Sequence, residues 1–212
     1  MTIHWGLLLL ALPLLFFPAD RLLSELVRLR GFDYFQSLEN SPRHRPWWWI
    51  PILWLDPPRA FVGTLSLQHA LGIAGNDWAH VSKLSFVLFA AGLIAAVFAQ
   101  TITRRDPHAL LAPIGFVSGI LVALVVWPVA CVGLAMGITG LFGVRKFPAF
   151  FAAAFAAVAA LGLALQSAAM QLAPALGVLI TPIIVAFLTR KTLELPTRND
   201  SHPRRFAAQG RV

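Results

Sequence analysis

The sequence predicts an all-α, polytopic helical membrane protein with about four to six transmembrane helices and interfacial amphipathic helices near the N-terminus. Hydrophobic residues make up 58% of the 212 residues, and charged residues only 12%. Soluble domains are about 45–50% apolar and about 25% charged. The apolar residues also gather into long runs, with Lys and Arg at the ends of those runs. These observations exclude a soluble globular enzyme, and so much apolar material excludes disorder for most of the chain.

The first region, residues 1–83, is predicted to be membrane-associated. It opens with an apolar run over residues 5–17, which is short for a full span of about 20 residues. The run has no preceding Lys or Arg and no cleavage site of small residues, so we expect a retained membrane segment rather than a signal peptide. Residues 20–30 follow with leucines at helical spacing opposite charged residues, which predicts an amphipathic helix.

A stretch rich in tryptophan and proline follows at residues 40–58. Tryptophan favours the headgroup level of a bilayer, and arginine there reaches lipid phosphates. The predicted membrane-interface residues are Trp47, Trp48, Trp49, Trp54, Arg43 and Arg45. The prolines argue against a long regular helix, although a second surface helix is expected over residues 59–71. Tryptophan beside arginine also stacks nucleic-acid bases, but the hydrophobic spans favour a lipid partner and no nucleic acid.

The second region, residues 84–189, is predicted to be the transmembrane bundle, with spans over 84–103, 110–142, 147–170 and 176–189. The run from Leu110 to Phe142 would make a helix of roughly 50 Å, against a hydrocarbon core of about 30 Å. It is therefore strongly tilted, kinked near Pro128, or folded there as a hairpin. The third region, residues 190–212, is a basic tail that we expect to be cytoplasmic and disordered.

Two topologies follow from the run at 110–142. A single crossing places 15 Lys and Arg residues on the side of the tail and leaves only Arg104 and Arg105 on the other side. A hairpin places residues 19–83 on the other side and reduces that count to 10. Basic loops stay cytoplasmic, which favours the single crossing. Both topologies keep the C-terminus in the cytoplasm, and the predicted location is a bacterial inner membrane.

Little in the sequence indicates chemistry. The long apolar runs contain no ionisable residue, and such residues mark ion paths and proton relays in membrane proteins. His69, Asp77 and His80 form the one cluster with metal-ligating side chains, but their spacing is unspecific and a fourth ligand is missing. Cys131 is the single cysteine, so it forms neither an internal disulfide nor a cysteine-based metal site. We expect no catalytic residue, no metal and no cofactor.

Small residues at a spacing of four predict close helix packing, because they let helix backbones approach each other in a membrane. The predicted packing residues are Gly115, Gly119, Gly133, Gly137, Ala152, Ala156 and Ala160. These strips pack within one chain or mediate contacts with a second copy or a partner protein.

Three functions remain open on these patterns. The first is a non-enzymatic scaffold or accessory subunit of a membrane complex, with a protein partner or a second copy of itself. The second is a small channel or transporter without intramembrane charges. The third is a lipid-modifying enzyme that uses His69, Asp77 and His80 at the membrane surface.

Overall fold

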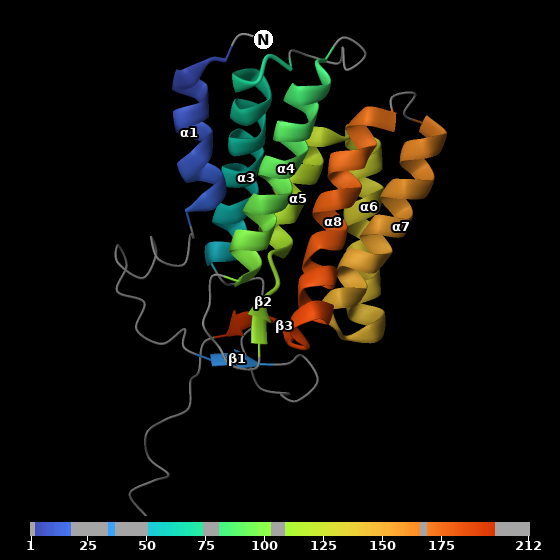
Figure 1. The fold of residues 1–212 in the computed structure, drawn as a ribbon. Helices are drawn as coiled ribbons and strands as arrows, with labels where there is room; N and C mark the ends of the chain where they lie inside the picture. The colour runs from blue at the N-terminus through green and yellow to red at the C-terminus, as the bar shows by residue number, and fades with distance from the viewer. Residues whose placement is uncertain are drawn as a thin grey trace, which may run out of the picture.

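A computed structural model of the chain describes residues 3–17, 34–36, 51–73, 81–102, 109–165 and 169–197. These residues form helices that run side by side, with three short strands at one end (Figure 1). The helices are α1 (Trp5–Phe16), α3 (Pro51–Ala70), α4 (Lys83–Ile102), α5 (Ile114–Leu124), α6 (Trp127–Val144), α7 (Phe147–Leu165) and α8 (Ala169–Thr189). Among the described residues, four helical segments are long and apolar enough to cross a membrane: α4, α6, α7 and Met170–Thr189 of α8. The predicted all-α polytopic membrane class is confirmed.

The helices form two halves that meet at α8. Helices α1, α3, α4 and α5 make one half, and α6 and α7 pack against each other in the other half (Figure 1). Helix α8 contacts α7 on one side and both α4 and α5 on the other. Buried residues of all seven helices belong to one hydrophobic cluster, so the described parts of residues 1–83 and 84–189 share a core.

The run at 110–142 is a helical hairpin, not the single crossing that the charge count favoured. Helix α5 ends at Leu124, and Val125 and Val126 have extended backbone before α6 begins. Pro128 lies in the first turn of α6, where proline fits because its missing N–H would have no partner. Ile114 and Ser118 at the start of α5 share an apolar hollow of about 210 Å³ with Leu134 and Leu141 of α6. Only an antiparallel arrangement brings these positions together.

Helix α3 lies inside the bundle rather than on a membrane surface. It begins at Pro51 and continues through Pro57 and Pro58, although the prolines of this stretch argued against a long helix. Each proline removes one backbone donor. Pro57 and Pro58 are the seventh and eighth residues of the helix, and Arg59–Ala70 is proline-free. The helix packs against α1 and α5 and contributes buried residues from Asp56 to Ala70. Burial on more than one face explains its low amphipathicity.

Three short strands cover one end of the bundle: β1 (Tyr34–Gln36), β2 (Ala109–Leu111) and β3 (Thr192–Thr197) (Figure 1). Strand β3 lies in the middle, antiparallel to β1 and parallel to β2. The prediction of disorder from Arg190 onward is therefore wrong for residues 192–197. Leu193 is buried, and the backbone of β3 pairs with β1 on one side and with β2 on the other. The polar composition of the tail does not predict this pairing.

The helices alternate in direction between this strand end and the opposite end of the bundle (Figure 1). The backbone N–H of His4 donates to the carbonyl oxygen of Ala70 at 3.0 Å, which places the start of α1 beside the end of α3. The start of α4 and the α5–α6 turn lie at the same opposite end (Figure 1). The α6–α7 turn and the end of α8 lie at the strand end (Figure 1).

Candidate functional site

A buried ion pair lies on α3. Asp56 and Arg59 are one helical turn apart, and Arg59 Nη2 lies 2.9 Å from Asp56 Oδ1. Both residues are 8% exposed. A charge removed from water is costly unless a partner of opposite sign and further hydrogen bonds compensate it. The long apolar runs after Lys83 contain no ionisable residue, so this buried pair lies outside the spans that the sequence predicted.

The second terminal nitrogen of the Arg59 guanidinium reaches the end of α1. Nη1 donates to the carbonyl oxygen of Phe17, the residue that follows the helix. Helix α1 has only 12 residues, about 18 Å at 1.5 Å per residue, so it is shorter than a bilayer core. Its last carbonyl groups have no partners within the helix and carry its negative dipole end. The arginine supplies both a donor and a positive charge there.

Gln100 of α4 supplies further hydrogen bonds at the same place. Its Nε2 donates to the carbonyl oxygen of Leu15 at 3.0 Å and to that of Phe17 at 3.4 Å. Gln100 is 3% exposed. An unsatisfied carbonyl in hydrocarbon costs several kcal/mol. Side chains from α3 and α4 thus compensate the early end of α1 and join three helices at one point.

Helix α5 closes the site from the other side. The Phe116 ring lies under the Arg59 guanidinium, with 5.1 Å from Cζ to the ring centroid. This distance is within the range of a cation–π contact. Gly119, one turn further along α5, allows the close approach, because a Cβ there would overlap the carbonyl oxygen of Pro57. Arg59 Nε is buried without a hydrogen-bond partner among the described residues.

The arrangement of these groups joins α1, α3, α4 and α5 at one place. The Asp56 carboxylate is held against the Arg59 guanidinium at hydrogen-bond distance. Within the described ranges, no group of three or more His, Cys, Asp or Glu side chains is placed to hold a metal ion. The site is thus an electrostatic clamp on the end of α1.

The predicted packing glycines lie between helices. Gly115, Gly119, Gly133 and Gly137 are buried, and Gly115 lines the hollow between α5 and α6. A Cβ on Gly133 would lie 2.5 Å from Cγ2 of Val158, and one on Gly137 would lie 2.9 Å from the Phe150 ring. These two glycines, together with Gly140, whose added Cβ would lie 2.8 Å from the Ala149 carbonyl oxygen, let α6 and α7 pack closely.

The predicted packing alanines of α7 lie elsewhere. Ala152, Ala156 and Ala160 are exposed on the outer face of the helix. The buried face of α7 presents Ala154 and Val158 instead. The alanine strip therefore lies on a different face of α7 from the buried residues, and its contact with a second copy or a partner protein stays a prediction.

Several other predicted residues lie outside the described residues: Trp47, Trp48, Trp49, Arg43, Arg45, Asp77 and His80. The same is true of the expected amphipathic helix at 20–30. Trp54 is 67% exposed on α3. His69 is exposed near the end of α3, and its Nδ1 lies 2.8 Å from the Leu65 carbonyl oxygen. The absence of a catalytic or metal role for the histidines stays a prediction.

Sequence reasoning missed this pair because it placed Asp56 in the stretch rich in tryptophan and proline and Arg59 at the start of a surface helix. The signal that could have revealed the pair is its i,i+3 spacing, which places opposite charges one helical turn apart.

Comparison with protein-family models, curated proteins and solved structures finds no match for this chain.

Proposed function

We propose that this chain is a non-enzymatic scaffold or accessory subunit of a membrane complex. The clamp on α1 carries the proposal. Arg59, Asp56 and Gln100 form hydrogen bonds with one another or with backbone of the same chain. Intramembrane ionisable residues are a functional hypothesis by default, but here these groups fix the position of a short helix. A fixed helix bundle is what an assembly protein requires.

The exposed alanine strip of α7 is the proposed contact surface for a partner or a second copy. We expect Ala156→Leu to reduce the amount of partner, or of oligomer, that co-purifies in mild detergent, because the larger side chain prevents close backbone approach. Thermal stability of the monomer should stay unchanged, because Ala156 is exposed. The matched control is Ala95→Leu, an exposed alanine on α4. Unchanged co-purification of the Ala156→Leu protein, or a purified parent that carries no stoichiometric partner and stays monomeric, contradicts the proposal.

We further propose that the strand end faces the cytoplasm of a bacterial inner membrane. Fifteen of the 17 Lys and Arg residues belong to segments that leave or re-enter the bundle at this end. Five lie between α1 and α3, two between α4 and α5, two in the α6–α7 turn and six after α8. The other two are Lys83, at the opposite end, and Arg59, inside the bundle. The positive-inside rule supports this orientation.

Reporter fusions test this orientation and the crossing of α3 together. Alkaline phosphatase, which is active only outside the cytoplasm, should be silent when inserted within residues 37–50 or fused after Val212. It should be active when inserted within residues 74–80, because α3 separates the two insertion sites. A C-terminal fusion to a fluorescent protein provides the reciprocal control. Equal signals from 37–50 and 74–80 would place residues 19–83 on one side and overturn this topology.

A small channel or transporter is the second candidate. The observation in its favour is that α3 places a series of polar residues in the core of the bundle: Asp56, Thr64, Ser66 and Gln68. Thr64 Oγ1 donates to the Ala60 carbonyl oxygen at 2.7 Å, a bond within the same helix. Flux of ions or small solutes into liposomes that contain the purified protein, reduced in the Gln68→Leu variant, would favour this function over the scaffold.

A further inference from the structure

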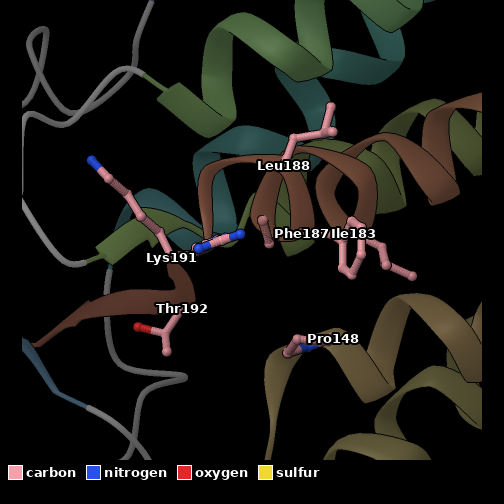
Figure 2. A pocket seen from close by; sticks show the side chains of 8 residues that line it. Pro148, Ile183, Phe187, Leu188, Lys191 and Thr192 are labelled. Carbon is pink, nitrogen blue, oxygen red and sulfur yellow. The ribbon is translucent and has the colours of Figure 1, made fainter.

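A second feature of the strand end is a hollow between the start of α7 and the end of α8, with a volume of about 770 Å³. Its wall is apolar and includes Pro148, Ile183 and Phe187. Figure 2 shows Pro148 across the hollow from Ile183 and Phe187, with Lys191 and Thr192 at one side. Phe187 is 82% exposed and Leu188 is 74% exposed. A hollow with such a wall is suited to hydrocarbon rather than to water.

The rim of the hollow is basic. Arg190 and Lys191 line it directly. Arg145 and Lys146 form the α6–α7 turn just before α7 begins, and both are exposed. Helix α7 begins at this end of the bundle with its partial positive charge, while α6 and α8 end there with partial negative charges. The positive charge of the rim therefore comes from its side chains, of which Arg190 and Lys191 line the hollow.

The end of α8 fixes the two rim residues in place. The backbone N–H of Lys191 donates to the Ala186 carbonyl oxygen at 3.2 Å, and Arg190 has a positive φ of 55°. This is the pattern of a helix that ends in a left-handed residue, most often glycine. The left-handed backbone conformation is unfavourable for any residue with a Cβ. Arginine here nevertheless places a positive charge at the rim, which glycine would not.

We propose that this hollow binds one anionic phospholipid of the surrounding leaflet. The phosphate and headgroup lie against Arg190 and Lys191, and an acyl chain lies along Phe187, Ile183 and Pro148. An apolar wall below a basic rim matches the two parts of such a lipid, and basic pockets between transmembrane helices bind anionic headgroups. A free phosphate would leave the apolar wall without a partner, and a zwitterionic lipid would bring no net negative charge to the basic rim.

Native mass spectrometry of the delipidated full-length protein in mild detergent tests the proposal. Phosphatidylglycerol is titrated against phosphatidylcholine with the same acyl chains. We expect saturable binding of one phosphatidylglycerol at much lower concentration than phosphatidylcholine. Each rim charge contributes about fivefold in affinity, so Arg190→Gln with Lys191→Gln should weaken phosphatidylglycerol binding about 30-fold. Phe187→Ala should weaken both lipids.

Two matched variants control for general effects. Lys83→Gln removes an exposed charge at the opposite end of the bundle, and Leu163→Ala truncates an apolar side chain of α7 that is 72% exposed. Both should bind phosphatidylglycerol like the parent. Equal affinity for the two lipids, parental binding by the double rim variant, an equal loss in Lys83→Gln, or displacement by inorganic phosphate at equal concentration would each overturn the proposal. The melting temperature of each variant shows whether it is folded.

Discussion

Replacing Arg59 by leucine is expected to destabilise the helix bundle by about 3–5 kcal/mol, the cost of breaking a buried ion pair by removing one partner. The substitution leaves the Asp56 carboxylate buried without its cation. It also removes a donor from the Phe17 carbonyl oxygen at the end of α1. Unfolding of the purified protein by added SDS, followed by tryptophan fluorescence, measures the loss.

Two further variants make this prediction specific. Asp56→Leu combined with Arg59→Leu should be less destabilised than the sum of the single variants, because the double variant buries no uncompensated charge. Lys83→Leu, an exposed cation at the start of α4, should change stability by no more than about 0.5 kcal/mol. If Arg59→Leu is as mild as Lys83→Leu, the clamp does not stabilise the fold.

Gly119→Ala is expected to have the second largest effect, a loss of about 1–3 kcal/mol from overpacking. The added Cβ meets a backbone carbonyl oxygen of Pro57, and backbone cannot move aside as a flexible side chain can. Helices α3 and α5 must then separate, which also loosens the contact between Arg59 and Phe116. Thermal unfolding in detergent measures the effect.

Gly143→Ala is the matched control on α6, because a Cβ there meets nothing within 4 Å. It should be neutral or stabilising by up to about 1 kcal/mol, since alanine is the better helix former. Gly133→Ala should fall on the destabilised side, because its Cβ meets the Val158 side chain. A Gly119→Ala protein that melts at or above the temperature of Gly143→Ala contradicts the close packing of α3 and α5.

The long apolar runs predicted the fold class correctly because a bilayer span needs only length and hydrophobicity. The same criterion failed for α3, whose Asp56, Arg59 and Gln68 lower its hydropathy and whose burial depends on partners in other helices. Composition does not reveal that Arg59 meets the end of α1, because the two residues of that contact lie 42 positions apart. The clamp therefore became visible only in three dimensions.

The predicted and the observed topology place the same number of basic residues at the end of the bundle that carries the tail, although they differ in two helices. The sequence favoured a single crossing at 110–142 and kept residues 19–83 on one side. In the structure this run is a hairpin, and α3 crosses between the two ends of the bundle. The number of basic residues at the tail's end is 15 in both descriptions, but Arg104 and Arg105 replace Arg59 and Lys83. A charge count alone could not distinguish these arrangements.

A single cross-link tests most directly whether α3 lies inside the bundle against α1. The Cβ of Leu14 lies 3.1 Å from the position of a Cβ on Gly63, close to the separation of about 3.5–4.5 Å found in disulfides. In a Cys131→Ser background, Leu14→Cys with Gly63→Cys should form a disulfide on mild oxidation. A protease site inserted within residues 37–50 then yields fragments that stay joined until reduction. The neighbouring pair Leu14→Cys with Val62→Cys, where Val62 is 45% exposed, should not cross-link. Fragments that separate without reduction in the Leu14–Gly63 protein, or that stay joined equally in both, would contradict a buried α3.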